Sequence, residues 1–251
     1  MIPAFLAPFQ SEIEKRKLDT IKIKATPLAN GEKLAITQSK FLGQPYLPVG
    51  MDYPKGTDGK PLIMLAQINF AEAPALENYP AEGILQLFVH PTKWDEMKDY
   101  KVLFHEAVTD NFQTNFGFLK PNLFDESPIE CEHKLEFRKE TEYGSVCDFR
   151  FDVTFGGKSY DDYQETLPQA EMEELENLFY ITGHKIGGYA SFTQEDPRSN
   201  DDKSKDDVLL LQVDSDRKIM FGDSGVANVF INIEDLKNKR FDKAYFNWDC
   251  C

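Results

Sequence analysis

Polar side chains that could contact a ligand end two apolar runs of similar sequence. Gln67 and Asn69 end the first run, and Gln212 and Asp214 end the second. A polar group is costly to bury in an apolar strand unless it is hydrogen-bonded. These side chains therefore either satisfy neighbouring backbone groups, which is the simpler interpretation, or face a ligand.

The turn 222–225 supplies two further candidates, Asp223 and Ser224. Glycine and aspartate tolerate positive φ, so the segment is typical of a β-hairpin connection between 219–221 and Val226 onward. A loop tip can also offer ligand groups. With the four residues above, Asp223 and Ser224 complete the set of candidate binding residues.

The spacing motifs of common catalytic and metal sites are absent from the sequence. The four histidines are scattered singly, without a His-Glu-x-x-His or His-x-His pattern, and are His90, His105, His133 and His184. No nucleophile elbow, Walker loop or dinucleotide-binding glycine pattern occurs, and 43 acidic residues are too many to select an acid–base pair without geometry. We predict no catalytic residue, metal or cofactor, and leave enzymatic activity open.

Cysteine usage points to a reducing compartment. The four cysteines, at positions 131, 147, 250 and 251, are too few for a disulfide scaffold at this length. We expect reduced thiols, with a redox pair at Cys250 and Cys251 as the alternative. The first ten residues have no basic region ahead of an apolar run, so we expect a cytoplasmic protein.

The formal charge of −15, from 28 basic and 43 acidic residues, restricts the partners. It opposes binding to nucleic acid or an anionic membrane and favours a basic protein. No run approaches the roughly 20 apolar residues of a membrane span. The loop 195–207 is the expected contact because it concentrates acidic residues, although a solvated coil is the plainer interpretation. Its aspartates are Asp196, Asp201, Asp202, Asp206 and Asp207.

Hydrophobic periodicity predicts a strand-dominated fold. The expected strands are 20–26, 33–37, 62–69, 83–89, 101–106, 134–139, 149–155, 188–193, 208–213, 219–221 and 226–231. Helices are expected over 9–17, over 167–180 behind a Thr166–Gln169 capping box, and after Asn232. The runs 62–68 and 208–213 should be the most buried strands.

The sequence also aligns with itself, which predicts an internal duplication. Residues 39–46 and 62–70 match 184–191 and 207–215 at one constant offset, and 83–89 match 225–231 after a shorter loop. The identities are Lys40/Lys185, Gly43/Gly188, Gln67/Gln212, Gly83/Gly225 and Phe88/Phe230. We expect a single domain over 1–251 with repeat halves at about 20–110 and 165–250.

Distinctive segments accompany these matches. They are Gln67-Ile-Asn69, Gln212-Val-Asp214, Phe221-Gly-Asp-Ser-Gly-Val226, Val229-Phe-Ile231 and Phe241-Asp-Lys-Ala-Tyr-Phe-Asn-Trp-Asp-Cys250. Together they resemble the YwqG-like family of bacterial proteins of unknown function, from about Phe41 to Cys250. The resemblance implies a cytoplasmic protein with no established reaction, some of whose relatives are linked to toxin immunity, and it carries over no catalytic residue.

These observations predict an α+β, β-rich fold made of two similar β-sheet halves with covering helices. The function we expect is that of a noncatalytic interaction protein, related to toxin immunity and binding a basic partner. The alternative is a small-ligand-binding protein, or an unrecognised hydrolase, with a cleft between the two halves.

Overall fold

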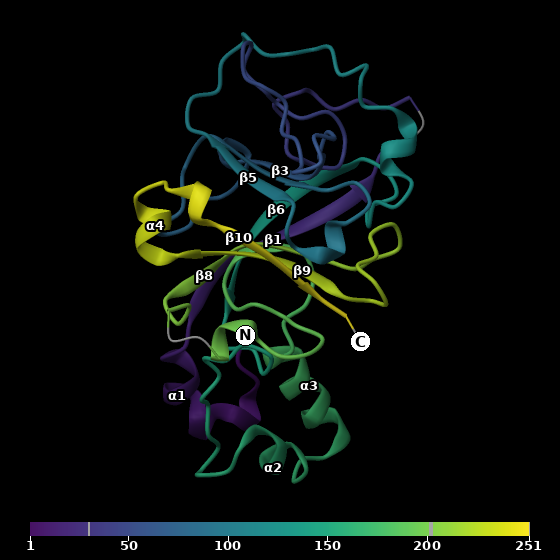
Figure 1. The fold of residues 1–251 in the computed structure, drawn as a ribbon. Helices are drawn as coiled ribbons and strands as arrows, with labels where there is room; N and C mark the ends of the chain where they lie inside the picture. Colours follow the sequence, from purple (N-terminus) through teal and green to yellow (C-terminus); the bar gives the residue numbers. More distant parts are fainter. Residues whose placement is uncertain (30, 201–202, 251) are drawn as a thin grey trace.

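The structure, a computed structural model, describes residues 1–29, 31–200 and 203–250. Its strands form one antiparallel ten-stranded sheet in the order β10-β9-β8-β7-β1-β6-β2-β3-β4-β5 (Figure 1). The strands are β1 Leu18–Pro27, β2 Lys40–Phe41, β3 Ile63–Asn69, β4 Ile84–Val89, β5 Tyr100–His105, β6 His133–Glu142, β7 Lys185–Gly187, β8 Asp207–Asp214, β9 Val226–Asn232 and β10 Tyr245–Asp249. The α-helices are α1 Gln10–Glu14, α2 Tyr160–Gln164, α3 Gln169–Phe179 and α4 Ile233–Lys237.

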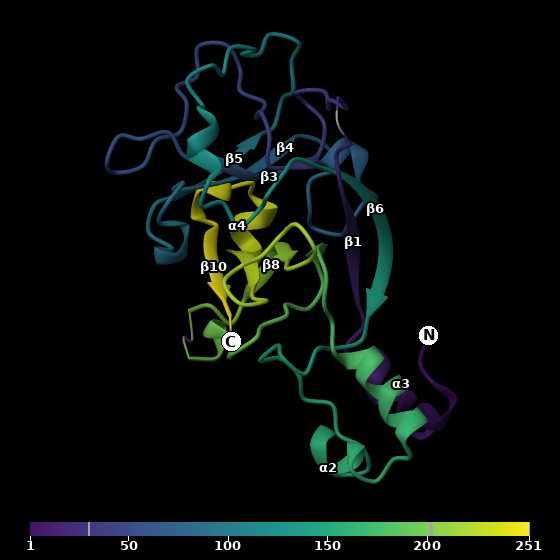
Figure 2. The ribbon, with the colours of Figure 1, turned by 90° about the vertical axis from the view of Figure 1, so that its right-hand side faces the viewer.

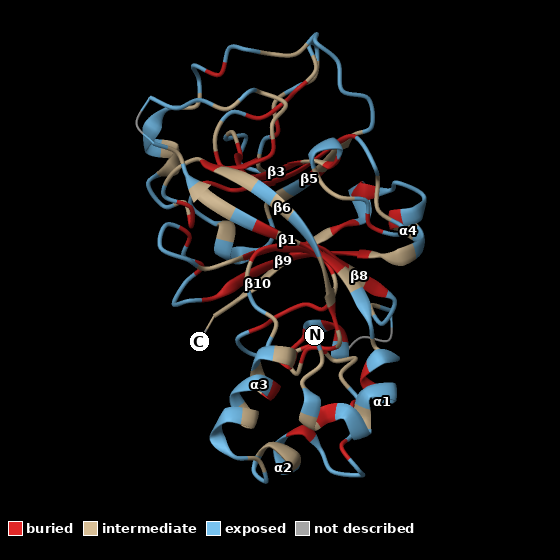
Figure 3. Cartoon of the chain, turned by 180° about the vertical axis from the view of Figure 1, so that it is seen from behind, coloured by how far each residue is buried: buried red, intermediate tan, exposed pale blue. Residues whose placement is uncertain are grey.

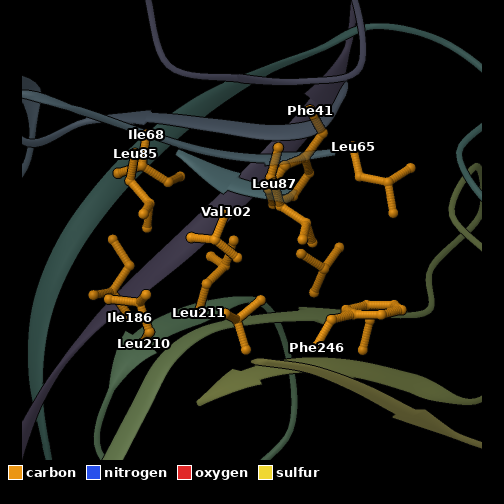
Figure 4. Packing of buried hydrophobic residues seen from close by; sticks show 14 of the residues in the cluster. Phe41, Leu65, Ile68, Leu85, Leu87, Val102, Ile186, Leu210, Leu211 and Phe246 are labelled. Atoms are coloured by element: carbon orange, nitrogen blue, oxygen red, sulfur yellow. The ribbon is translucent and has the colours of Figure 1, made fainter. Parts of the chain in front are cut away.

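The sheet folds over on itself, so that its two ends form two layers around one core. The long central strands β1 and β6 pair over ten residues and curve between the layers (Figure 2). Leu65, Leu85 and Leu87 from one layer face Leu211 and Phe246 from the other (Figure 4). The almost continuous apolar runs of β3, β4, β8 and β9 suit strands inside these two layers, because little of either face is left to water.

The two ends of the sheet repeat the same local pairings. In one, β2 places Lys40 opposite Gln67, and in the other β7 places Lys185 opposite Gln212. The register shifts between Met64 and Ala66 of β3, and at the matching place in β8. Because β2 pairs with β6 and β7 pairs with β1, both ends are parts of one continuous sheet.

A second, smaller core lies at one end of the sheet. The 3-10 helix η1, Ala4–Phe9, packs with α1, α2 and α3 below the strands (Figure 1). Leu6, Leu175 and Phe179 are fully buried there, while the outward faces of α2 and α3 are exposed (Figure 3). The N-terminal segment was expected as one helix over 9–17 and is instead η1 followed by the short α1.

Seven of the expected strands are confirmed with small changes of boundary, and four are wrong. The segments 33–37, 149–155, 188–193 and 219–221 form turns, irregular chain or isolated bridges. In 188–193 the reason is that side chains replace the strand ladder, since the backbone amides of Tyr189, Ala190 and Ser191 donate to Glu142, Asp148 and Gln212.

Two local expectations at the helices have different outcomes. The helix expected over 167–180 is confirmed as α3, but its capping box is wrong, because Pro168 is the N-cap and the Thr166 hydroxyl donates to the Tyr163 carbonyl. The helix after Asn232 is confirmed as α4, and the Asn232 side chain caps it by accepting from the amide of Glu234.

Candidate functional site

The predicted binding residue Gln67 holds neighbouring loops together from a fully buried position. Its Oε1 accepts from the amide of Tyr46 at 2.7 Å and from Gln86 Nε2 at 2.8 Å. Its Nε2 donates to the carbonyls of Ile36 and Gln38. All the hydrogen-bonding capacity of this amide nitrogen is used by the protein.

Gln212 has the matching position and a similar role. Its Oε1 accepts from the amide of Ser191 and its Nε2 donates to the carbonyl of Gly183, both at 2.8 Å. Asn69 caps a 3-10 turn through the amide of Ala71 and also donates to the carbonyl of Thr37.

The remaining predicted site residues lie apart from Gln67. Asp214 accepts from the amides of Gly183 and Ser215, and Asp223 and Ser224 are exposed in the turn 222–225, where Ser224 has a positive φ of 57°. Among the described residues no hydrogen bond joins these groups to the Gln67 cluster, so the predicted residues do not form one site.

Two buried lysines lie at equivalent positions in the two ends of the sheet. Lys40 begins β2 and is 1 % exposed, and Lys185 begins β7 and is 0 % exposed. Each ammonium donates to the backbone carbonyl four residues later, Gln44 in one case and Tyr189 in the other. Each also has a glutamate partner at one end of β6. Glu132, just before the strand, is the partner of Lys40, and Glu142, its last residue, is the partner of Lys185.

Burial makes both lysines unusual bases. Desolvation lowers the pKa of Lys40 from 10.5 to about 8, against the opposing charges of Glu132 and Glu72. Desolvation likewise lowers the pKa of Lys185 to about 8, with Glu142 opposing it. A lysine whose pKa approaches neutrality can act as a nucleophile or base, and such groups concentrate at functional sites.

The second pair, Lys185 and Glu142, is in direct contact, and we call it closed. Lys185 Nζ lies 2.9 and 3.0 Å from the two carboxylate oxygens of Glu142. The same carboxylate pairs with Lys22 at 2.9 Å and accepts from the amide of Tyr189 at 2.8 Å. Every group in this cluster is engaged by another, as a structural ion pair requires.

The first pair, Lys40 and Glu132, is not in hydrogen-bond contact, and we call it open. Lys40 Nζ donates to the carbonyls of Ala35 at 2.9 Å and Gln44 at 3.1 Å. Its glutamate partner lies further away, with Glu132 Oε1 at 3.9 Å, which is beyond hydrogen-bond distance. Glu132 is 30 % exposed, and burial raises the pKa of its carboxyl while Lys40 opposes the rise.

A cavity of about 400 Å³ adjoins the open pair. Its lining combines Lys40 and Glu132 with apolar side chains, the arrangement usual for small-molecule sites. The lining residues are Lys33, Leu34, Ile36, Lys40, Gly43, Gln44, Phe116, Leu119, Phe124 and Glu132. We call this space the Lys40 cavity.

Two other cavities are less suited to a ligand. A larger one of about 750 Å³ contains Lys22 and Glu142, whose charges already pair with each other. Another, of about 400 Å³, lies between the two ends of the sheet beside Tyr79, whose hydroxyl donates to the carbonyl of Leu209. Size alone would favour the first, but the more loosely paired lysine and glutamate lie in the Lys40 cavity.

The acidic loop 195–207 differs from the expected solvated coil. Asp196 and Asp207 are 5 % and 7 % exposed, and between them lies Arg198, which is fully buried and ion-paired to Asp196 at 2.6 Å. Asp201 and Asp202 lie outside the described residues. The Asp196 carboxylate and the Asp207 backbone carbonyl both accept from Arg198, because a buried arginine needs anionic and carbonyl partners, and the Asp207 carboxylate accepts from the Tyr245 hydroxyl.

Metal sites, membrane spans and reactive thiols are three further classes of feature. The residues that the structure describes contain no group of three or more His, Cys, Asp or Glu side chains placed to hold a metal ion. None of the helices in this part of the chain is both long and apolar enough to cross a membrane. Cys131, Cys147 and Cys250 are free thiols, and burial raises the pKa of the first two; Cys251 lies outside the described residues.

Because the pKa of Lys40 is low in the folded protein, the free energy of unfolding should depend on pH. The folded protein binds fewer protons than the unfolded chain between pH 8 and about 10.5, so this group adds stability as pH rises and its contribution is lost as pH falls through 8. Relative to Lys40→Met, the wild type should gain about 2 kcal/mol between pH 7 and 9.5. Urea unfolding of both proteins across this range measures the difference in their free energies of unfolding. The titrations of the tyrosines and of Lys185 occur in both proteins and therefore cancel in this difference. A difference in stability that does not change with pH would contradict the lowered pKa of Lys40.

Comparison with known families finds a match over most of the chain. The model described as "Domain of unknown function (DUF1963)" matches residues 39–250, which include β2 to β10 and, within the Lys40 cavity, both Lys40 and Glu132. Comparison with curated proteins finds no match. Since the match covers most of the sequence, the chain belongs to the DUF1963 family of domains of unknown function.

Proposed function

We propose that this protein binds a small ligand, with an apolar body and one oxygen-bearing head group, in the Lys40 cavity. The observation that carries the proposal is the contrast between the two equivalent lysines. Glu142 engages Lys185 with both oxygens, whereas Glu132 stands 3.9 Å from Lys40 beside a cavity. A carboxylate or carbonyl oxygen in that cavity could accept the third N–H of Lys40, and the aromatic and aliphatic walls could cover the rest of the ligand.

The test uses 3-phenylpropionate, which has an aromatic body and one carboxylate. Titration calorimetry should show binding to the wild type and an affinity about 10-fold or more lower for Lys40→Met, because a charge-assisted hydrogen bond contributes about 1.5 to 3 kcal/mol.

The matched control is Lys185→Met, which removes the equivalent but closed lysine. It should keep the wild-type affinity, provided that circular dichroism shows the variant to be folded. No binding by the wild type, or equal binding by Lys40→Met, would contradict the proposal.

A second candidate is the interaction with a basic protein, including a role in toxin immunity. Its support is the formal charge of −15 and the segment 159–184, which has seven acidic residues and no lysine or arginine. Asp161, Asp162, Glu165, Glu173 and Glu174 are exposed on this segment. It is a better contact than the loop 195–207, whose Asp196 and Asp207 are buried.

The prediction for this candidate concerns Glu165, Glu173 and Glu174. Replacing all three by glutamine should leave the melting temperature nearly unchanged, since exposed charges contribute little to stability. Affinity capture from a cytoplasmic extract, read by mass spectrometry, should recover less of any cationic partner. Capture should also weaken with salt, because screening acts over about 10 Å at 0.1 M. A partner whose recovery is unaffected by the variant and by salt would exclude this surface.

We also propose that the two ends of the sheet arose by duplication, with halves at about 20–110 and 165–250 in a single domain. The equivalent lysine pairings and register shifts support this origin. We further propose that the chain belongs to the YwqG-like group and acts in the cytoplasm, on the segments that resemble that group.

A further inference from the structure

We infer that Lys40 forms a reversible imine with small apolar aldehydes and ketones that enter the Lys40 cavity, with Glu132 as the proton carrier. The inference rests on the proposed function, because the cavity must first admit a ligand. It adds the chemical class of that ligand and the atom that bonds to it.

The position of the amine is the first argument. Lys40 is 1 % exposed and yet lines the cavity, so its Nζ meets a ligand in an environment from which most water is removed. The carbonyls of Ala35 and Gln44 fix Nζ at 2.9 and 3.1 Å. A nucleophile held in place beside an apolar wall is suited to attack a bound carbonyl carbon.

The protonation state is the second argument. With a pKa of about 8, about one Lys40 side chain in ten is a neutral amine at pH 7, against about one in 3000 for an ordinary lysine. The lone pair needed for attack is therefore far more available at Lys40 than at an exposed lysine.

Glu132 supplies the acid–base partner. Its carboxylate lies 3.9 Å from Lys40 Nζ and lines the same cavity, and burial raises its pKa. Glu132 takes one proton from the ammonium, and the neutral Nζ then bonds to the carbonyl carbon as the C=O π electrons move to oxygen. A second Nζ proton passes to that oxygen, giving a neutral carbinolamine. Glu132 returns its proton to the hydroxyl, the C–O bond breaks, and the products are one protonated imine and one water molecule.

Lys185 provides an internal control of the same residue type. Its pKa is also about 8, but both oxygens of Glu142 hold it, and it is not part of the lining of the Lys40 cavity. Lys33 is the opposite control, because it is exposed and lines the same cavity. Reactivity that followed pKa alone would label Lys185, and reactivity that followed access alone would label Lys33.

The experiment treats the full chain at pH 7 with 3-phenylpropanal and cyanoborohydride, which reduces imines to stable amines. Peptide mass mapping should find Lys40 labelled at least 10-fold faster than Lys33 and Lys185. Excess 3-phenylpropionate should protect Lys40, and Glu132→Gln should slow its labelling at least 10-fold.

The outcomes separate this inference from the proposal beneath it. If 3-phenylpropionate binds in a Lys40-dependent way but Lys40 is labelled no faster than Lys33, the imine is refuted and the binding site stands. If 3-phenylpropionate does not bind and Lys40 is not labelled, both fail. Fast labelling of Lys40 that Glu132→Gln leaves unchanged would overturn the role given to Glu132.

Discussion

Replacing Gly188 by alanine should lower the free energy of unfolding by about 4 kcal/mol. The φ of Gly188 is +73°, a conformation that costs a residue with a Cβ about 1 to 2 kcal/mol. The added Cβ would also overlap Oε2 of Glu142 and stand 2.9 Å from Cβ of Thr20. Glu142 has no room to yield, because it is buried and holds Lys185, Lys22 and the amide of Tyr189. The cost of the steric overlap and the cost of the positive φ therefore add, and urea unfolding measures the total loss of unfolding free energy.

Gly43→Ala is the matched control at the equivalent position. Its φ is +91°, and its Cβ would meet Oε1 of Glu132 at 2.5 Å. Glu132 is 30 % exposed and loosely paired, so its side chain can rotate away. We expect a loss of about 1 to 2 kcal/mol, mostly from the backbone. Equal losses of unfolding free energy for the two variants would show that Glu142 and Glu132 are held equally firmly. That result would contradict the distinction between the closed and open pairs.

Replacing Arg198 by methionine should cost about 3 to 5 kcal/mol, the usual effect of removing one partner from a buried ion pair. Arg198 is fully buried and pairs with Asp148 at 2.8 Å and with Asp196 at 2.6 Å. It also donates to the carbonyl of Asp207 and packs 4.5 Å above the ring of Phe230. The variant would leave two buried carboxylates without this cation, and urea unfolding at pH 7 should show the loss.

The effect of Arg198→Met should shrink in acid. Burial opposes the ionisation of Asp148, but Arg150 and Arg198 outweigh it and lower its pKa to about 2. In the wild type this carboxylate stabilises the fold above its ordinary pKa of 3.8, and the contribution is lost as pH falls through 2. The deficit of the variant should therefore decrease from pH 5 to pH 3. A deficit that stays constant would assign the effect to lost packing on Phe230.

Arg150→Met is the control for position. Arg150 also pairs with Asp148, at 2.7 Å, but its side chain is 26 % exposed and water can replace part of its contact. We expect a smaller loss than for Arg198→Met, of about 1 to 2 kcal/mol. If Arg150→Met proves the more damaging, Arg198 is not the centre of this cluster.

The sequence by itself determined the elements whose pattern is local. The apolar runs 62–68 and 208–213 predicted the buried strands β3 and β8, because a strand covered on both faces needs apolar residues at successive positions. They are not the most buried strands, since β4 and β9 are buried to the same degree. Internal comparison also aligned Lys40 with Lys185 and Gly43 with Gly188. It gave no reason to treat these lysines as anything but surface residues, since lysine is rarely buried.

Only the tertiary structure decided what those lysines do. β2 and β7 are two and three residues long, too short for any periodic signal. The carboxylates that pair with their lysines lie at the two ends of β6, far away in the sequence. The buried Asp196, Arg198 and Asp207 were hidden for the same reason, because a polar composition predicts a solvated loop unless the partners are known. Apolar burial is set by the chain's own pattern, whereas the burial of a charge depends on a partner that folding supplies.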